Sequence, residues 1–291
     1  MAYGTPATPA DIAAYYTHIR GGRAPTPEQI KALADRYQAI GGSSPLLEIT
    51  RATAAALAAR LLTRVYVGMK HWHPFIEETV ERMHREGVQR AVAITLAPHY
   101  SRMSVGGYIK SAQAASEEHG GPILHCIESW HDHPGLIRAL GTRVQDALGR
   151  LPHAQAAVIF TAHSLPKRII EWNDPYPTQL VETSKAVAAD AGVERWSFAF
   201  QSASATGEPW LGPDVLDAIR DLRAKGIGSV VICPIGFVAD HLEVLYDIDV
   251  EAKQLTDRFK MRLVRTSSLN AAPEFIEILA EIAQRALAAA V

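Results

Sequence analysis

The sequence has few cysteines, no long apolar run and almost no net charge. Cys126 and Cys233 are its only cysteines, and their wide separation argues against a disulfide framework or a thiolate metal site. Each falls in an apolar run, where a buried small side chain is the simplest interpretation. No apolar stretch approaches the ~20 residues that span a bilayer. The formal charge of −2 over 291 residues is not that of a nucleic-acid-binding protein.

Targeting and nucleotide-binding motifs are absent as well. The first residues have neither the basic start nor the apolar core of a signal peptide. Gly4-Thr5-Pro6 and Gly212-Pro213 fit no dinucleotide or P-loop fingerprint, and Ser164 does not lie in a G-x-S-x-G elbow. With 48% apolar and 21% charged residues, the composition is that of an ordinary globular protein, and we expect it in the cytoplasm.

Short apolar runs alternate with longer amphipathic segments along the chain. Thr26-Pro27-Glu28-Gln29 is typical of a helix start, Gly41-Gly42 of a helix end, and Asp214 of a second helix start. The alternation predicts an α/β architecture of parallel sheets with helices on both faces. The predicted strands are Val65–Met69, Ala91–Leu96, Ile123–Ile127, Ala157–Thr161, Trp196–Phe200, Ser229–Cys233 and Met261–Arg265.

These strands divide unevenly, with four after Leu151 and three before it. A doubly wound sheet normally begins with a strand, whereas Met1 opens on what reads as the loop after one. We therefore expect roughly eight to ten residues of a first strand to be missing upstream, with a genuinely shorter first strand as the alternative. The expected domains are 1–150 and 151–270, with the boundary in Gln145–Ala156. The amphipathic helix at 271–291 is expected to fold back onto the first domain.

The segment Thr161-Ala162-His163-Ser164-Leu165-Pro166 places a histidine just after a strand. Open α/β sheets bind ligands at the carboxyl ends of their strands. Imidazole accepts protons near neutral pH and binds borderline divalent metals. The alternative for His163 is a structural role in a turn before the next helix, and this motif alone does not separate the two.

A line of carboxylates follows the predicted strand Ser229–Cys233. Glu243, Asp247 and Glu251 are spaced by four residues, so they share one helical face. Oxygen ligands suit hard cations and, together with imidazole, Fe²⁺. The line could therefore pass a metal ion or protons toward a buried site. A solvated acidic face is the usual meaning of such a run, but this one begins after a strand and is embedded in apolar residues.

Cationic and aromatic residues gather in the first 45 positions. Tyr15-Tyr16-Thr17-His18-Ile19-Arg20 precedes Arg36-Tyr37 and the turn that contains Ser44. Guanidinium groups bind carboxylates in pairs of hydrogen bonds, and aromatic faces stack on flat rings. A flat ligand with carboxylates at its edge could bind to both the guanidinium groups and the aromatic rings. Arginine and tyrosine side chains on helices are, however, more often ordinary surface residues.

Taken together, these motifs resemble the ferrochelatase family, and more specifically its bacterial coproporphyrin branch. The resemblance runs from Met1 to about Leu287. Its tyrosine-containing opening differs from the NLGGP that is common in the protoporphyrin branch. The segments that carry the resemblance are MAYGTP, YYTHIRGGR, LADRYQAIGGSSPL, LAPHYSRMSVGGY, TAHSLP, DPYPTQL, WLGPDV and PIGFVADHLEVLYDID.

The resemblance implies two flavodoxin-like domains with a porphyrin cleft between them. It implies that His163 and Glu243 contact the incoming iron and act as the catalytic pair, with Asp247 and Glu251 as the acidic ladder that leads to them. Tyr3 would face them from the opposite side and could ligate the metal of the product. Porphyrin-contacting positions implied in the same way are Arg20, Arg36, Tyr37, Ser44 and Tyr108.

The implied activity is insertion of Fe²⁺ into coproporphyrin III to give coproheme in heme biosynthesis. Iron would be a substrate, and neither a tightly bound cofactor nor an iron–sulfur cluster is expected. The expected protein is a monomer without nucleic-acid or membrane-spanning partners, whose product passes to a coproheme-processing enzyme. Three alternatives stay open: protoporphyrin IX as substrate, Co²⁺ or Ni²⁺ chelation into another tetrapyrrole, and a tetrapyrrole carrier without turnover.

Overall fold

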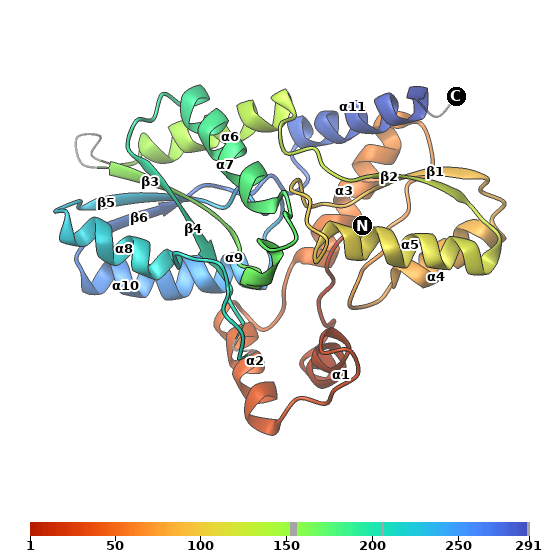
Figure 1. The fold of residues 1–291 in the computed structure, drawn as a ribbon, viewed down its shortest axis with the longest axis horizontal. Helices are drawn as coiled ribbons and strands as arrows, with labels where there is room; N and C mark the ends of the chain where they lie inside the picture. Colours follow the sequence, from red (N-terminus) through yellow and green to blue (C-terminus); the bar gives the residue numbers. More distant parts are fainter. Residues whose placement is uncertain (152–155, 205–206, 290–291) are drawn as a thin grey trace.

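The computed structural model describes residues 1–151, 156–204 and 207–289. Two parallel sheets, each flanked by helices, lie side by side, and a helical arm projects beneath them (Figure 1). The predicted α/β architecture is therefore confirmed. Within the described residues, every helix is too short or too polar to cross a membrane.

The larger sheet is made by the second half of the chain. Its parallel strands run in the order β4 (Trp196–Gln201), β3 (Ala156–His163), β5 (Ser229–Cys233), β6 (Arg262–Arg265). The inner strands β3 and β5 are buried along almost their whole length, because helices cover both faces of the sheet. This is why they read in the sequence as continuous apolar runs.

Alternate side chains of β3 pack into two separate hydrophobic cores. Phe160 packs on the side of α6 (Pro134–Leu148) and α7 (Tyr176–Asp190). Ile159 points the other way, toward α8 (Val215–Ala224) and the helix that begins with α9 (Leu242–Tyr246). This alternation follows from the two-residue period of a strand.

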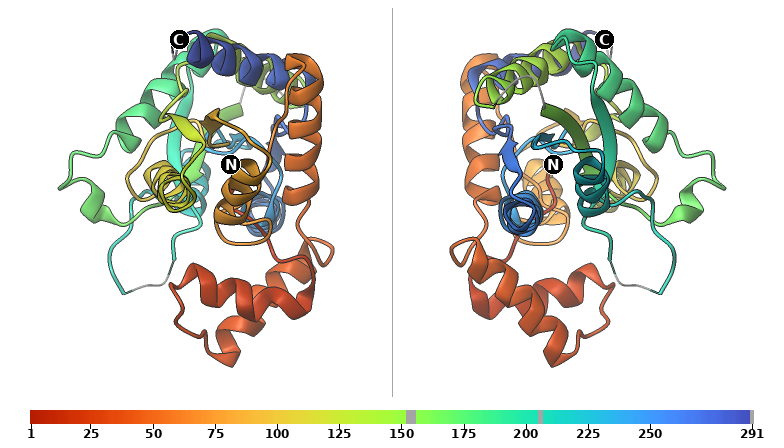
Figure 2. Two further views of the ribbon diagram at one scale, coloured as in Figure 1. Left: turned by 90° about the vertical axis from the view of Figure 1, so that its right-hand side faces the viewer. Right: turned by 90° about the vertical axis from the view of Figure 1, so that its left-hand side faces the viewer.

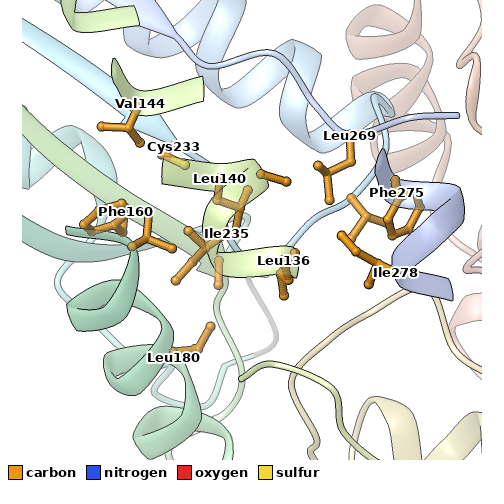
Figure 3. Packing of buried hydrophobic residues seen from close by; sticks show 14 of the residues in the cluster. Leu136, Leu140, Val144, Phe160, Leu180, Cys233, Ile235, Leu269, Phe275 and Ile278 are labelled. Atoms are coloured by element: carbon orange, nitrogen blue, oxygen red, sulfur yellow. The ribbon is translucent and has the colours of Figure 1, made fainter. Parts of the chain in front are cut away.

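Helix α6 precedes the domain boundary expected from the sequence, yet it packs on the second sheet. Figure 3 shows Leu136, Leu140 and Val144 of α6 in one cluster with Phe160 of β3 and Cys233 of β5. We therefore propose that the second unit begins before α6. Part of the boundary stretch expected from the sequence, residues 152–155, lies outside the described residues.

The smaller sheet belongs to the first half and contains the parallel strands β1 (Arg90–Ile94) and β2 (Ile123–Ile127). Met1–Tyr3 lies beside β1: the Met1 amine donates to the Ile94 carbonyl at 2.6 Å, and Leu96 N donates to the Met1 carbonyl at 2.8 Å. On its other side, Ala2 bonds through its main chain to residues 68 and 70. The spatial order in the smaller sheet is thus 68–70, 1–3, β1, β2. Numbered by their place in the sequence, these segments are the second, first, third and fourth, as are β4, β3, β5, β6 in the larger sheet.

The predicted strand Val65–Met69 is wrong. Within this range only Met69 forms bridges, to Ala2 and Phe75, and no ladder develops over residues 65–68. A strand needs a partner along its length, and Met1–Tyr3 reaches only its last residues. The other six predicted strands are confirmed to within two residues at each end.

Helices flank the smaller sheet on both faces. They are α3 (Leu46–Leu61), α4 (Ile76–Arg85) and α5 (Val105–His119), together with the terminal helix α11 (Pro273–Ala289). Helix α11 packs along α3 and β1 and also along α6. Its Glu277 pairs with Arg60 of α3, and its Glu274 pairs with Arg143 of α6. This helix therefore spans both halves of the molecule (Figure 1).

The arm comprises the short turn η1 (Pro9–Asp11), α1 (Ile12–Ile19) and α2 (Pro27–Ala39). It stands apart from both sheets (Figure 2). The predicted helix start is confirmed: the Thr26 side chain accepts from Gln29 N, and the Gln29 side chain accepts from Thr26 N. Helix α2 packs against α9, which brings the arm to the carboxyl ends of the larger sheet.

Candidate active site

The candidate site forms where three neighbouring strands end. His163 is the last residue of β3 and pairs in register with Gln201, the last residue of β4. The loop after β5 leads to α9, which carries Glu243. Carboxyl ends of parallel strands meet at one edge of a sheet, so residues 38 or more apart in sequence converge here.

Two imidazoles hold the carboxylate of Glu243. His163 Nε2 lies 3.3 Å from Glu243 Oε1, and His241 Nε2 lies 3.5 Å from Glu243 Oε2. Each imidazole is oriented through its other nitrogen: Nδ1 of His163 contacts the Ser164 carbonyl, and Nδ1 of His241 lies 2.9 Å from the Ala239 carbonyl. The side chains of His163 and Glu243 remain 29% and 28% exposed, so a ligand can reach them.

The pKa values of this pair are strongly perturbed. Burial disfavours the charged imidazole, but the charge and hydrogen bond of Glu243 outweigh it and raise the pKa of His163 to about 9. Burial likewise opposes ionisation of Glu243, yet His163 and His241 hold its pKa well below the usual range. At neutral pH the site therefore contains an imidazolium and a carboxylate.

The carboxylate line continues from Glu243 through a π-helical segment, η4 (Asp247–Ala252), which joins α9 to α10 (Lys253–Arg258). π-Helical turns are rare and occur frequently at functional sites. Asp247 is buried and accepts hydrogen bonds from Ser202 Oγ and, at 3.4 Å, from Gln201 Nε2. Burial raises the pKa of Asp247 to about 6, with Glu243 adding to the shift. This carboxyl can therefore exchange a proton near neutral pH.

Tyr3 approaches the pair from the smaller sheet. Its ring centre lies 4.6 Å from that of His71 with the two planes tilted by 57°, and the residue is 39% exposed. Enclosure among these groups and the nearby charge of Glu243 raise the pKa of the Tyr3 hydroxyl, which stays protonated. The structure thus places Tyr3 and the His163–Glu243 pair within electrostatic reach of each other.

Arg36, one of the arm residues singled out in the sequence, lies near the carboxylate line. Its guanidinium lies 5.0 Å above the ring of Tyr246, and its charge acts on Asp247. Arg20 instead contacts Tyr16 and the Arg23 carbonyl within the arm itself.

Three further predicted contact residues have structural partners. Tyr37 is buried and its hydroxyl bonds to Thr5 Oγ1 at 3.0 Å, which ties the arm to the Met1–Pro6 segment. Ser44 Oγ accepts from Leu46 N at the start of α3. Tyr108 is buried between α4 and α5, with the ammonium of Lys70 4.8 Å above its ring. Burial raises the pKa values of the Tyr37 and Tyr108 hydroxyls, and the charge of Glu243 adds to both shifts, so these two side chains are within electrostatic reach of the His163–Glu243 pair.

Several site residues escaped sequence reasoning. His241 is the second partner of Glu243, and Gln201 connects Asp247 to the Glu243 carbonyl. The Tyr176 hydroxyl donates to the His163 carbonyl at 3.0 Å and fixes the end of β3. The rule that sites form at strand ends could have identified Gln201, since it ends the strand beside β3.

Within the described residues, no three His, Cys, Asp or Glu side chains converge as a metal-binding group. The acidic side chains are instead spread along one helix. This spacing suits a cation or a proton that moves between groups better than one held permanently.

Comparison with known proteins identifies the family to which this chain is similar. The family model described as Ferrochelatase matches residues 1–287. The coproporphyrin III ferrochelatase of Geobacillus thermodenitrificans (strain NG80-2) is 49% identical over 299 residues, covering 99% of this chain and 95% of that protein. The coproporphyrin III ferrochelatase of Bacillus subtilis (strain 168) is 46% identical, with 99% and 96% covered. A ferrochelatase of Herpetosiphon aurantiacus is 43% identical, with 96% and 95% covered.

Solved structures share the fold at low sequence identity. SirB from Bacillus subtilis with Fe³⁺ matches with a TM-score of 0.62 at 13% identity, covering 82% of this chain and 88% of that one. CbiX, described as the terminal enzyme of siroheme biosynthesis in denitrifying bacteria, matches with a TM-score of 0.54 at 15% identity, covering 85% and 94%. These two likenesses concern the fold alone.

Proposed function

Because the chain belongs to the ferrochelatase family, we propose that it inserts Fe²⁺ into coproporphyrin III and releases coproheme. The observation that carries the proposal is the Glu243 carboxylate held between two imidazoles at the ends of β3 and β5. The substrate preference follows the names of the relatives that match nearly the full chain.

The reaction exchanges one cation for two protons. Fe²⁺ enters the macrocycle, and each of two pyrrole N–H groups loses a proton, so the site needs a proton acceptor and a route for the metal. We assign the acceptor role to His163 and the metal-holding role to Glu243. Asp247 and Glu251 lead along the helix toward them.

The ion pair between His163 and Glu243 determines the order of proton transfer and metal entry. At neutral pH His163 already carries a proton, so it must lose that proton before it can accept one from the porphyrin. An approaching divalent cation supplies the driving force, since positive charge beside an imidazolium lowers its pKa. Asp247, with its pKa near 6, is placed to take protons onward.

The porphyrin is proposed to lie between Tyr3 on one side and the His163–Glu243 pair on the other. Arg36 and Arg20 of the arm would bind propionate carboxylates, and Tyr37, Ser44 and Tyr108 would border the macrocycle. Bending of the ring at this site would expose nitrogen lone pairs to the metal, with the strain supplied by the carboxylate contacts.

We further propose a cytoplasmic monomer without a tightly bound cofactor that delivers coproheme to a processing enzyme. The test is an anaerobic assay with Fe²⁺ and either coproporphyrin III or protoporphyrin IX, followed by absorbance, with Co²⁺ and Ni²⁺ in parallel. We expect turnover with iron and coproporphyrin III. Preference for protoporphyrin IX would overturn the substrate assignment, and tight porphyrin binding without turnover would indicate a carrier.

His163→Ala separates the catalytic role from binding. It should abolish insertion while coproporphyrin still binds, as measured by quenching of tryptophan fluorescence. Wild-type rates in this variant would remove His163 from the mechanism, and His241→Ala serves as the comparison for loss of an imidazole that touches Glu243 from the other side.

A further inference from the structure

Arg265 is the last residue of β6 and lies at the same edge of the larger sheet as the candidate active site. It pairs in register with Ile232 of β5, the strand whose loop leads to α9. Its side chain is 15% exposed, and the roles assigned to His163, Glu243 and Asp247 do not involve it. A guanidinium that is largely buried needs partners for its donors, because an unpaired charge is costly there.

Two carboxylates bind this guanidinium. Asp249 accepts a pair of hydrogen bonds, from Nε to Oδ1 at 2.8 Å and from Nη2 to Oδ2 at 2.9 Å. Asp240 accepts a third, from Nη1 to Oδ1 at 3.1 Å. The paired geometry at Asp249 requires the planar fork of an arginine, and the compact ammonium of a lysine has no equivalent.

Asp240 fixes the start of the helix that carries Glu243. Its Oδ1 also accepts from Ser268 Oγ at 2.7 Å, and its Oδ2 accepts from Asn270 Nδ2 at 3.0 Å. Its main-chain N–H donates to Asn270 Oδ1 at 2.8 Å. The next residue, His241, begins α9 without a side-chain cap. The first turn of α9 is therefore held through Asp240 and not by a cap of its own.

Asp249 lies on the opposite side of the same helix from the carboxylate line. It follows Asp247 by two residues, and residues two apart in a helix point in nearly opposite directions. Asp247 meets Ser202 on the side of the active site, whereas Asp249 meets Arg265 on the side of β6. Both belong to the π-helical segment η4. Because π-helical turns are rare, we expect this one to depend on contacts from outside the helix.

We propose that Arg265 is a positioning residue for metal insertion. By binding Asp240 before the helix and Asp249 behind it, Arg265 fixes how Glu243 and Asp247 are aligned along the route of the cation. The inference rests on the proposed insertion of Fe²⁺, since the alignment of these carboxylates matters for a cation that passes along them. Loss of the Arg265 contacts should therefore impair the use of Fe²⁺ and leave porphyrin binding intact.

The test compares Arg265→Lys with Arg143→Lys. Arg265→Lys keeps the positive charge but removes the fork that binds Asp249 while a third bond reaches Asp240. Arg143 is the matched control, because its side chain is similarly buried at 12% exposed and its partner Glu274 lies on α11, away from the candidate site.

In the anaerobic assay, kcat/KM for Fe²⁺ should fall at least about tenfold in Arg265→Lys, because small displacements of reacting groups are costly. It should stay within about twofold of wild type in Arg143→Lys. The Kd for coproporphyrin, from quenching of tryptophan fluorescence, should be the same in all three chains.

Hydrogen exchange tests the same contacts without turnover. The amides of η4, residues 247–252, should exchange at least about tenfold faster in Arg265→Lys than in wild type, and equally in Arg143→Lys. Asp249→Asn should have the same effect on exchange and on kcat/KM for Fe²⁺, because it weakens the helix half of the contact and leaves Asp240 paired. It replaces Arg265→Lys if that chain does not fold.

Wild-type kcat/KM for Fe²⁺ in Arg265→Lys would overturn the proposal. Faster exchange of η4 in that case would show that the Arg265 contacts only stabilise the fold. An equal loss of kcat/KM in Arg143→Lys would overturn it too, since general destabilisation would then explain the effect. Failure of the proposed function is a separate result: the wild-type chain itself would show no insertion, whatever the exchange of η4.

Discussion

Replacing Glu243 by glutamine preserves the shape of the side chain and removes the charge that His163 faces. In the wild type that charge, 3.3 Å from Nε2, raises the pKa of His163 from the ordinary 6.5 to about 9. In Glu243→Gln, burial still lowers the pKa, so His163 should titrate near or below 6.5. The difference of about 2.5 pH units corresponds to about 3 kcal/mol of coupling.

The assay is a pH titration of the histidine ring nitrogens by long-range ¹H–¹⁵N correlation. Twelve histidines must be distinguished, and the spectrum of His163→Gln identifies the signal. Glu251→Gln is the matched control, since it removes one carboxylate of the same line and should leave the pKa of His163 near 9. A His163 that still titrates above pH 8 in Glu243→Gln would refute the electrostatic argument.

The same coupling predicts a pH dependence of stability. Because the folded pKa of His163 is raised, its contribution is complete below 6.5 and is lost as pH rises toward 9. The folded pKa of Glu243 is depressed, so its contribution is complete above its ordinary 4.5 and is lost at lower pH. Urea unfolding should show the largest difference between wild type and Glu243→Gln, about 3 kcal/mol, between pH 4.5 and 6.5. A difference that grows toward pH 9 would contradict this sign.

Three further substitutions test other contacts. Arg36→Ala should raise KM for coproporphyrin severalfold, because the guanidinium is proposed to bind a propionate, and any change in kcat would follow from the loss of its charge beside Asp247; an unchanged KM would contradict this. Asp174→Ala should lower the unfolding free energy by about 2 kcal/mol, since this buried carboxylate accepts from Ser101 Oγ and Arg102 N; unchanged urea midpoints would show that these bonds are dispensable. Thr26→Ala should cost about 1 kcal/mol and about 2 °C in Tm, and Thr26→Ser should restore most of it.

The sequence was sufficient to predict secondary structure correctly wherever a local pattern of residues determines it. The strands Ile123–Ile127 and Ser229–Cys233 were predicted to the residue, because short apolar runs are bounded there by turns and helices. The cap at Thr26 follows from side-chain chemistry alone. The rule that parallel strands place their carboxyl ends together put His163 and Glu243 each after a strand of the second half, and the family resemblance implied that they form a pair.

Non-local pairing accounts for what the sequence did not show. Val65–Met69 has the composition of a strand, but a strand exists only where a second chain segment bonds to it. Tyr37 was expected among the porphyrin-contacting positions, and nothing in the sequence indicated that its hydroxyl bonds to Thr5, 32 residues earlier. The π-helical segment at Asp247 was hidden because the same side chains suit an α-helix, and one additional residue per turn leaves no mark on composition.

The terminal helix α11 has a consequence for how ligands enter and leave. Because it packs along α3 and β1 on one half and along α6 on the other, with an ion pair to each of these helices, it joins the two halves directly. The arm is held by other contacts: α2 packs against α9, Tyr15 of α1 donates to the Gly4 carbonyl at 3.2 Å, and the Tyr37 hydroxyl of α2 bonds to Thr5 Oγ1. A ligand that enters or leaves past the arm would therefore have to break these arm contacts, and not the packing of α11 between the two halves.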